Sequence, residues 1–364
     1  MRILLLTPLY PPAIGGAAIY FADIVPLLEE APEIEQMVLL TEQMPGEPKE
    51  ATTGKLTVLR LLPTRVSRER PYPIHALTYM QTQRWFPRKL ARLVKECQID
   101  LVHFHTRYRG KLAYRALAKL PVPVLADLRD KMSDPAALAR CSQHLLCCAQ
   151  GVKDFAIGGG YPVGRLTHIP IPFVTPVPLP QTVLQAALNH FGLGERPFLF
   201  YAGDMTMNKG VFALLDAFEQ WQVGHPGIDL VLAGMNREGR PFAGRVEQVP
   251  QVHFLSHIPH AQALALMQAS EMVLLPSRSE GLPLTILEAV ALGKKVLCPP
   301  NIPEFDTHLP DFVLPEVTIE AILASLNAIW HNPALPGYPL DNHQVESVVA
   351  RLLQVYKKML SNRT

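Results

Sequence analysis

The chain has few cysteines, a small net charge and no long apolar run, and each of these shortages argues against a class of protein. Five of its 364 residues are cysteines, an odd number without the spacing of a disulfide framework or a metal site. The adjacent Cys147 and Cys148 lie in an apolar run, which predicts reduced, buried thiols and a cytoplasmic protein. No apolar stretch reaches about 18 residues, so no membrane-spanning helix is predicted. The apolar start, which ends at Pro8, is too short for a signal peptide.

Motifs of several other enzyme classes are missing as well. The sequence contains no Walker loop, no His-Glu-x-x-His, no Cys-x-x-Cys and no Gly-x-Ser-x-Gly. It also lacks the Gly-x-Gly-x-x-Gly fingerprint of dinucleotide-binding domains and an Asp-x-Asp metal-binding motif. A net charge of +2 and the lack of a nucleic-acid-binding module predict no nucleic-acid partner.

The chain does have enough apolar sequence for large cores. Hydrophobic residues make up 48% and charged residues 18%, which is typical of globular proteins. The length exceeds the roughly 250–300 residues at which a single core stops growing, so two domains are predicted. Residues 1–180 carry a net charge of +7 and the remainder −5. A basic first half suits an anionic acceptor or a membrane surface, although an uneven scatter of loop charges gives the same totals.

Apolar runs of strand length alternate with helical patterns along the chain, which is the rhythm of parallel βα units. Five prolines within residues 170–180 make a stiff, extended segment, where we place a domain boundary. We predict an α/β fold of two Rossmann-like, doubly wound domains, 1–175 and 176–344, that face each other across a cleft, with ligands at the carboxyl ends of the strands. The expected strands are 2–6, 37–40, 56–62, 101–105, 123–126, 144–148, 166–169, 198–202, 230–233, 252–255, 272–275 and 295–298, and the expected helices include 17–30, 88–97, 111–118, 211–221 and 345–360.

The most informative segment covers residues 279–297. Its two carboxylates, Glu280 and Glu288, stand eight positions apart and flank a predicted helix start. Pro283 is expected at the first helical position and Gly293 just after the last. Glu280 then lies in the loop before the helix, and Glu288 lies about two turns into it.

This helix start is suited to a phosphate group. The amides of Gly281 and Leu282 point away from the helix and its positive end favours an anion. Glu280 is unfavourable beside a phosphate unless it binds something else, such as sugar hydroxyls. The acid spacing, Glu-Gly-x-Pro, Glu-Ala-x-Ala and the closing glycine together resemble the Glu-x7-Glu signature of retaining nucleotide-sugar glycosyltransferases of family 4, which have the GT-B fold. An ordinary helix with surface acids is the alternative.

The resemblance implies a nucleotide-diphosphate sugar as the donor. Glu288 would hold the ribose hydroxyls and Glu280 would contact the donor sugar. Lys209 and the amides at the helix start would stabilise the departing diphosphate. Such a site needs no metal and no cofactor, because helix ends and a cation replace them. The resemblance also implies that the anomeric configuration is retained without a covalent intermediate and that helix 345–364 returns to the first domain.

A second loop carries the expected cation. Strand 198–202 ends at Gly203, and the loop that leads to Lys209 resembles the family's Gly-Arg-x4-Lys-Gly motif. Lys209 at a helix entrance can neutralise a diphosphate, whereas a solvated loop lysine is the alternative. The family's arginine is replaced by Asp204, which cannot bind phosphate, so either another base substitutes or donor binding is weakened. Arg278 is a candidate substitute because it is next to the Glu280 loop in sequence.

The first domain has candidates for the remaining contacts. Gly15 and Gly16 allow close backbone approach to a ligand and resemble the family's N-terminal Gly-Gly loop, which faces donor phosphate and acceptor; simple turn chemistry is the alternative. His105 resembles a histidine of the family's Asp-x-x-His-x-His motif, and period 2 places His103 on the same strand face. A satisfied structural histidine is equally compatible with this pattern.

The next strand leads into Asp-Leu-Arg-Asp, a form found in a subset of the family. Asp127 and Asp130 are candidates for acceptor binding or proton transfer, and Arg129 for holding an anion or a neighbouring carboxylate. We expect these three residues on an irregular loop; a surface turn with an ion pair is the alternative. The predicted catalytic residues are therefore Glu280, Lys209, His105 and Asp130.

Residues 84–95 mix basic and aromatic side chains, and Arg65, Arg68 and Arg70 are close in sequence. Such segments bind anionic lipid surfaces, which predicts a peripheral contact with the inner face of a membrane. A solvated helix face with a buried tryptophan is the alternative.

Together these features predict a retaining, metal-independent glycosyltransferase of the hexosyltransferase type. The predicted acceptor is a glycan, a glycolipid or a small molecule, and the predicted role is surface polysaccharide or glycoconjugate synthesis. Two other classes remain open. One is a non-catalytic GT-B module that binds a glycan or a partner transferase, which Asp204 favours. The other is a GT-B sugar-nucleotide epimerase or glycan synthase.

Overall fold

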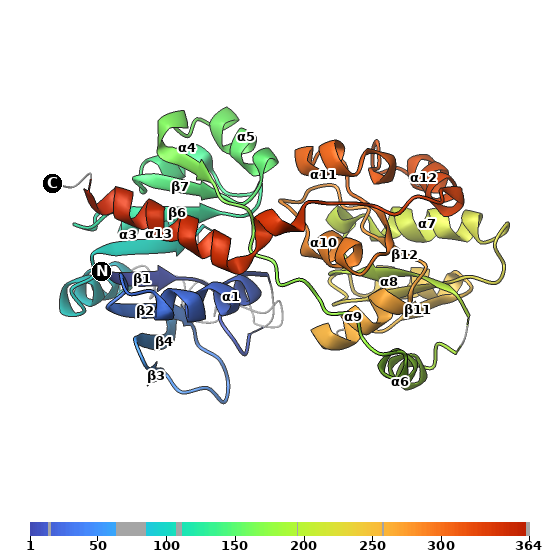
Figure 1. Ribbon diagram of the computed structural model, residues 1–364, viewed down its shortest axis with the longest axis horizontal. Coiled ribbons are helices and arrows are strands. Elements are labelled where there is room, and N and C mark those ends of the chain that lie inside the picture. The colour runs from blue at the N-terminus through green and yellow to red at the C-terminus, as the bar shows by residue number, and fades with distance from the viewer. Residues whose placement is uncertain (14–15, 63–84, 107–110, 195, 257, 362–364) are drawn as a thin grey trace. The chain divides into compact units, whose positions relative to one another are not determined.

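The computed structural model describes residues 1–13, 16–62, 85–106, 111–194, 196–256 and 258–361 (Figure 1). The chain divides into two compact units. Unit 1 comprises Met1–Val174 and Asn342–Thr364, and unit 2 comprises Thr175–Asp341. Each unit has its own α/β sheet, so the predicted class, two Rossmann-like doubly wound domains of the GT-B type, is confirmed. Within the described ranges, no helix is both long and apolar enough to cross a membrane.

Unit 1 is built on one eight-stranded sheet that is parallel except at one edge. Its strands are β1 (Arg2–Leu6), β2 (Gln36–Glu42), β3 (Glu50–Thr53), β4 (Leu56–Leu62), β5 (Leu101–His105), β6 (Val124–Leu128), β7 (His144–Cys147) and β8 (Leu166–His168). Their order is β3-β4-β2-β1-β5-β6-β7-β8, and only β3 runs antiparallel to its neighbour. The sequence did not predict β3, because its four residues are exposed and none is a large apolar residue.

Helices cover both faces of this sheet and pack against its apolar side chains. They are α1 (Gly16–Glu30), a helical segment over 85–96, α3 (Lys111–Leu117), α4 (Pro135–Ala139), α5 (Gln150–Gly158) and α13 (Val345–Ser361), with a 3-10 turn at Val163–Arg165. In Figure 1, α13 lies beside α1 on one face. The two helices share a buried cluster that includes Ile3, Phe21, Leu125, Leu352 and Tyr356, so the last helix of the chain completes the core of unit 1.

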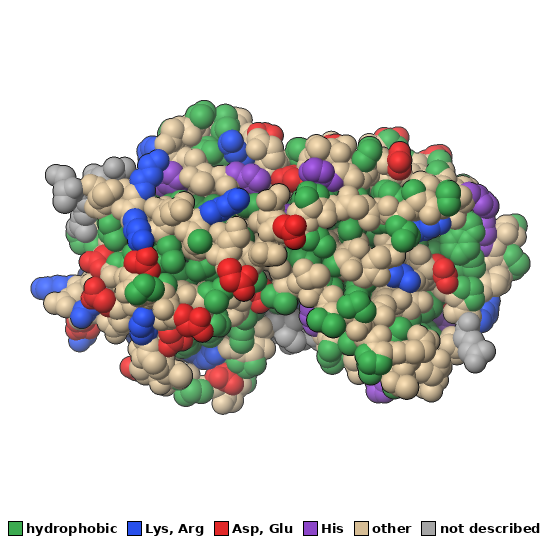
Figure 2. All heavy atoms as spheres, in the orientation of Figure 1, with side chains coloured by type: hydrophobic (Ala, Val, Ile, Leu, Met, Phe, Trp, Pro, Cys, Tyr) green, Lys and Arg blue, Asp and Glu red, His purple; other side chains and the backbone are tan. Residues whose placement is uncertain are grey.

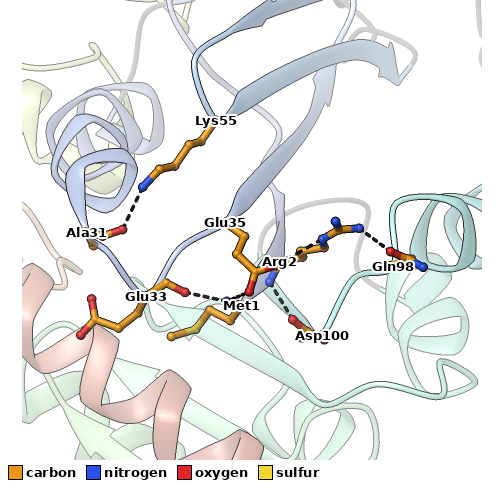
Figure 3. Close-up of polar contacts among 8 residues, drawn as sticks. All are labelled: Met1, Arg2, Ala31, Glu33, Glu35, Lys55, Gln98 and Asp100. Atoms are coloured by element: carbon orange, nitrogen blue, oxygen red, sulfur yellow. Dashed lines mark hydrogen bonds and ion pairs between the residues drawn. The ribbon is translucent and has the colours of Figure 1, made fainter.

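Polar contacts tie together the amino ends of neighbouring strands in unit 1 (Figure 3). The Met1 amino group donates to the Glu33 carbonyl, with 2.6 Å between nitrogen and oxygen. The Arg2 amide donates to the Asp100 carboxylate at 2.7 Å, and Lys55 Nζ donates to the Ala31 carbonyl at 3.1 Å. These contacts occupy the amino edge of the sheet, so the loops at its carboxyl edge are the ones left to carry binding groups.

Unit 2 is built on a five-stranded, fully parallel sheet. Its strands are β9 (Phe198–Ala202), β10 (Asp229–Ala233), β11 (Val252–Phe254), β12 (Met272–Leu274) and β13 (Lys295–Leu297), in the order β11-β10-β9-β12-β13. The strands are short, and all but the half-buried edge strand β11 are mostly buried, as expected for a sheet covered on both faces. The helices are α6 (Gln181–Phe191), α7 (Val211–Trp221), α8 (Arg240–Gln248), α9 (His260–Ala269), α10 (Leu284–Ala291), α11 (Pro303–His308) and α12 (Ile319–His331), with 3-10 turns at Met207–Lys209, Pro310–Phe312 and Leu340–His343.

The start of α10 differs from the prediction by one residue. Pro283 precedes the helix as its N-cap, with an extended ψ of 120°, and Leu284 is the first helical residue. Proline restricts φ but not ψ, so its presence does not determine which of the two positions it takes. Glu288 is therefore the fifth residue of the helix, little more than one turn from its start rather than two. Gly293 follows the helix with a φ of +67°, as predicted for a helix end.

One glycine in unit 2 is required by two constraints at once, and alanine should be poorly tolerated there. Gly210 has a φ of +71°, and a Cβ atom on it would lie 1.9 Å from the Pro276 carbonyl oxygen. Gly192 has a φ of +66° but open space around its Cβ position. We expect Gly192→Ala to lower the free energy of unfolding by about 1–2 kcal/mol, and Gly210→Ala to lower it by clearly more, measured by urea denaturation. Equal losses would mean that the contact with Pro276 relaxes at no cost.

Candidate functional site

Three loops of unit 2 meet at the carboxyl edge of its sheet. They follow β10, β9 and β12, which are neighbours in the sheet and parallel, so their carboxyl ends share one edge. The first two loops touch through backbone, because a Cβ on Gly234 would lie 1.9 Å from the Gly203 carbonyl oxygen. The loop after β12 is joined to the loop after β9 by the Arg278 amide, which donates to the Asn208 carbonyl at 2.8 Å. This edge collects the residues of unit 2 that were predicted to bind the donor, whereas Gly15 and Gly16 belong to unit 1.

Lys209 and Glu280, which are 71 positions apart, form an ion pair at this edge. Lys209 Nζ lies 2.5 Å from Glu280 Oε1, and the side chains are 29% and 14% exposed. Thr206 fixes the turn that presents the lysine, because its side-chain oxygen accepts a hydrogen bond from the Lys209 amide at 3.2 Å. The two residues predicted from separate motifs are thus held together, with the ammonium group still partly open to solvent.

The start of α10 lies next to this ion pair along the chain. Among the described residues, none accepts a hydrogen bond from the amides of Gly281 or Leu282. Thr285, in the first turn, donates a long hydrogen bond of 3.5 Å to the Ala202 carbonyl at the end of β9. The helix start therefore sits over the carboxyl end of the central strand, where its unpaired amides and its dipole favour an anion.

Glu288 has a partner that sequence reasoning missed. His260 Nε2 lies 2.8 Å from Glu288 Oε1; the histidine side chain is 58% exposed and the carboxylate 14%. His260 is the first residue of α9, the helix after β11. The pair forms because α9 and α10 pack together, and no motif in the sequence connects the two residues. It places a mostly buried carboxylate and an accessible imidazole side by side.

Asp204, the residue that departs from the family motif, also has a partner. Arg237 Nε lies 3.0 Å from Asp204 Oδ2, and the side chains are 49% and 45% exposed. Arg237 was not predicted, because it belongs to the loop after β10. Arg278, the predicted substitute, has an exposed side chain with no ion-pair partner among the described residues. Gly203 is half-buried, and a Cβ there would make a tight contact of 3.1 Å with Tyr201 Oη.

In unit 1, Asp127 is a buried strand residue rather than part of an exposed loop. It lies in β6 with no exposed surface, because that strand extends two residues beyond the predicted end. Its Oδ2 accepts from Arg129 Nε at 3.0 Å and lies 3.2 Å from His103 Nε2. The other ring nitrogen of His103 lies 2.7 Å from the hydroxyl of Tyr356 on α13. The Arg129 guanidinium carbon lies 3.2 Å above the centre of the Tyr20 ring.

This buried network determines the charge of Asp127. Burial alone would raise the pKa of its carboxyl group. The positive charge of Arg129 and the hydrogen bond with His103 outweigh burial and hold that pKa well below its usual range. Asp127 is therefore a carboxylate at neutral pH, and Arg129 holds this neighbouring carboxylate, one of the two roles considered for it.

The other predicted residues of unit 1 are His105, Asp130 and the two glycines. His105 is 5% exposed, and its ring contacts Phe21, as the His103 ring does, so the two histidines share a strand face. Asp130 is half-buried, and its Oδ1 accepts from the Met132 amide at 2.8 Å. Gly16 begins α1, and packing does not require glycine there, because a Cβ would meet no atom within 4 Å. Gly15 lies outside the described residues. In the parts of the chain that the structure describes, no three potential metal ligands cluster.

The basic and aromatic segment forms a helix over residues 85–96. Trp85 is half-buried, with Lys89 Nζ 6.0 Å from its ring centre, and Phe86 is the aromatic residue that is fully buried. Arg84, Arg65, Arg68 and Arg70 lie outside the described residues. On the face shown in Figure 2, acidic and basic side chains are intermixed over unit 1, so its positive net charge is not gathered into one patch on that face.

Two glycosyltransferase family models match the chain, one in each unit. Residues 189–344 match the family of glycosyl transferases group 1, and residues 14–173 match glycosyltransferase family 4. Glycogen synthase of Mycobacterium tuberculosis is 32% identical over 167 residues, which are 43% of this chain and 37% of that protein. The chain spans only about half, or less, of the length of the curated relatives it matches.

Two solved structures resemble nearly the whole chain. Sucrose-phosphate synthase from Thermosynechococcus elongatus superposes with a TM-score of 0.77 at 18% identity and covers 99% of both chains. HepE from Anabaena, in complex with UDP-glucose, superposes with a TM-score of 0.67 at 15% identity and covers 100% of this chain and 99% of its own. The fold and the two domain matches together place the chain in the class of GT-B glycosyltransferases. Its second unit carries the group 1 glycosyltransferase domain and its first unit the family 4 domain.

The buried Asp127 network makes a prediction about stability and pH. Because the folded-state pKa of Asp127 is lowered, its stabilising effect is present above the ordinary carboxyl pKa of about 3.9 and is lost as the pH falls below that value. Asp127→Asn should lower the free energy of unfolding at pH 7 by about 3–5 kcal/mol, since Arg129 stays buried without its partner. The difference from wild type should shrink between pH 5 and pH 3, measured by urea denaturation.

The matched control is Asp154→Asn, which changes an exposed aspartate of α5. It should leave the free energy of unfolding unchanged at every pH. A difference between Asp127→Asn and wild type that stays constant down to pH 3 would contradict the lowered pKa.

Proposed function

We propose that the chain is a retaining glycosyltransferase that takes its sugar from a nucleoside-diphosphate donor bound by unit 2. The observation that carries this proposal is the convergence of the Lys209–Glu280 pair and the unpaired amides at the start of α10 on one edge of the sheet. These groups provide a cation and backbone donors for a leaving diphosphate. The UDP-glucose complex of HepE, a protein of the same fold, supports this class of ligand.

The diphosphate takes the place beside Lys209 and the amides of Gly281 and Leu282. As the bond between the sugar and the diphosphate breaks, negative charge grows on the leaving phosphate oxygen. A preorganised ammonium group and helix start stabilise that charge without rearrangement. Lys209 must then leave Glu280 at least in part, which frees the Glu280 carboxylate to accept hydrogen bonds from hydroxyls of the donor sugar. This exchange explains why an acid lies beside a phosphate site.

Glu288 binds the ribose hydroxyls of the nucleotide. Its carboxylate is mostly buried and already has His260 as one partner, so its position is held before the nucleotide arrives. A carboxylate accepts hydrogen bonds from two adjacent hydroxyls with good geometry. His260, more than half exposed at the start of α9, lies where it can contact the same end of the nucleotide.

Unit 1 binds the acceptor, which we propose to be a glycan or a glycolipid used in surface polysaccharide or glycoconjugate synthesis. Asp130, half-buried beyond the end of β6, is accessible to an acceptor hydroxyl, and His105, at the end of the neighbouring strand β5, is the candidate for proton transfer. Asp127 and Arg129 hold the strand end through their buried ion pair. The transfer proceeds with retention, without a metal ion and without a covalent intermediate.

Two other functions are the alternatives, and Asp204 favours the first of them. A non-catalytic GT-B module would fold in the same way and bind a glycan or a partner transferase without a donor. A sugar-nucleotide epimerase would bind the same donor but release its epimer rather than transfer the sugar. Donor-dependent transfer or hydrolysis of the sugar separates the proposed enzyme from both.

Donor binding should depend on Lys209 and Glu288. We expect one of UDP, GDP or ADP to raise the melting temperature and to bind by calorimetry in buffer that contains EDTA. Lys209→Ala should weaken that diphosphate at least about 10-fold because a charge-assisted contact is lost. Glu288→Gln should weaken the diphosphate and the nucleoside alike, since its contact is with the ribose.

The matched control for Lys209 is Lys119→Ala, which changes an exposed lysine of unit 1. It should leave nucleotide binding unchanged. No binding of any of the three diphosphates to folded protein would contradict the proposed function and favour the non-catalytic module. Binding that requires a divalent cation would contradict the metal-independent mechanism.

We also propose that the helix over residues 85–96 contacts an anionic membrane, because Arg88 and Lys89 lie beside the half-buried Trp85. The variant Arg88→Gln with Lys89→Gln should sediment less with vesicles that contain phosphatidylglycerol, because each surface cation adds about 1 kcal/mol. The control, Arg115→Gln with Lys119→Gln, removes two exposed cations around α3. Equal loss in both variants would mean that only net charge matters, and no loss would contradict the contact.

A further inference from the structure

Two ion pairs of the same kind lie at the carboxyl edge of the unit 2 sheet. The first is Lys209 with Glu280, and the second is Arg237 with Asp204. Lys209 and Asp204 belong to one loop, five residues apart, at the end of β9. The resemblance described above assigns the lysine a partner cation at position 204, yet this chain has a carboxylate there. The carboxylate is in contact with an arginine from the neighbouring loop.

The two loops are held together by a short ladder of hydrogen bonds. The Met205 amide donates to the Met235 carbonyl at 2.8 Å, and the Arg237 amide donates to the Met205 carbonyl at 3.2 Å. The Met207 amide donates to Glu238 Oε1 at 3.0 Å. The backbone of Arg237 is therefore tied to the residue that follows Asp204. Its guanidinium group is positioned by backbone as well as by the ion pair.

We propose that Arg237 supplies the second cation of the donor diphosphate site and that Asp204 is its positioning residue. Compared with the family motif, the cation comes from the loop after β10 rather than from the loop after β9, and its charged group still lies beside position 204. This inference rests on the proposed function, because the ligand is the diphosphate that Lys209 also binds.

The chemistry of the pair fits this role. Arginine presents a planar set of N–H donors that matches a phosphate, and both side chains are about half exposed, so ligand can reach the guanidinium group. The Nε atom of the guanidinium group is hydrogen-bonded to Asp204. Asp204 therefore orients the group. Its negative charge also reduces the attraction for phosphate, so this carboxylate sets the affinity as well as the position.

The test is calorimetric binding of UDP, GDP and ADP, and of their monophosphates, to the full chain. Arg237→Gln should weaken the diphosphate that binds wild type by about 10- to 100-fold, the loss of a charge-assisted hydrogen bond, and should weaken its monophosphate less. Asp204→Asn should tighten the diphosphate several-fold, because the carboxylate that competes with phosphate is gone. The exchanged pair, Asp204→Arg with Arg237→Asp, should restore most of the affinity that Arg237→Asp loses.

The matched control is Arg196→Gln. Arg196 is also 49% exposed and also pairs with an aspartate, Asp229, but it lies before β9 at the opposite, amino edge of the sheet. It should leave all nucleotide affinities unchanged. Diphosphate binding that falls in Lys209→Ala but not in Arg237→Gln would overturn this inference alone. A wild-type protein that binds no nucleotide would overturn the proposed function and this inference together.

Equal losses for diphosphate and monophosphate in Arg237→Gln, with a lowered melting temperature, would mean that Arg237 only holds the loop, and would also overturn the inference. The salt dependence gives a further readout, since removing one phosphate contact should make binding less sensitive to salt.

Discussion

The site in unit 2 depends on backbone packed against backbone at the carboxyl ends of three neighbouring strands. Gly210 packs on the Pro276 carbonyl, and Gly234 packs on the Gly203 carbonyl, at distances that leave no room for a Cβ atom. A side chain at either position would push the two facing loops apart. Without this close approach, the charged groups of the three loops would not meet, although each loop could still fold by itself.

Close packing of the loops also explains why the site contains matched charges. In the absence of ligand, several cations beside a helix start would repel one another. The helix dipole that attracts phosphate would also repel each ammonium or guanidinium group. In this chain Glu280 neutralises Lys209, and Asp204 neutralises Arg237. An anionic ligand then exchanges partners with carboxylates that are already in place. The free energy needed to separate each ion pair lowers the affinity for the ligand. The carboxylates therefore set the affinity together with the number of cations in the site.

Much of this architecture could be predicted from the sequence, and the misses have physical reasons. Most predicted strands were within two residues of the observed ones because their side chains are apolar on both faces. The polar edge strand Glu50–Thr53 was missed because it has no such pattern.

Lys209 and Glu280 were each recognised within a motif. Their ion pair could not be predicted from the motifs, because it depends on β9 and β12 being neighbours in the sheet. Arg237 and His260 were missed because their partners lie on other loops, and only the order β11-β10-β9-β12-β13 brings them together. Asp127 was placed on a loop because it is a charged residue at a strand end. The sequence gives no sign of the buried guanidinium group and imidazole that pair with it.

Unit 1 cannot complete its core until the segment that follows unit 2 has been synthesised. Its core is closed by α13, whose Tyr356 reaches His103 through a hydrogen bond, while all of unit 2 lies between these two residues in the sequence. On the ribosome, unit 2 can be completed while unit 1 still lacks its last helix. The apolar surface around Phe21 and Leu125 and the imidazole of His103 stay uncovered until residues 345–361 emerge. A ribosome that stops before residue 345 would release a chain with one finished unit and one unfinished unit.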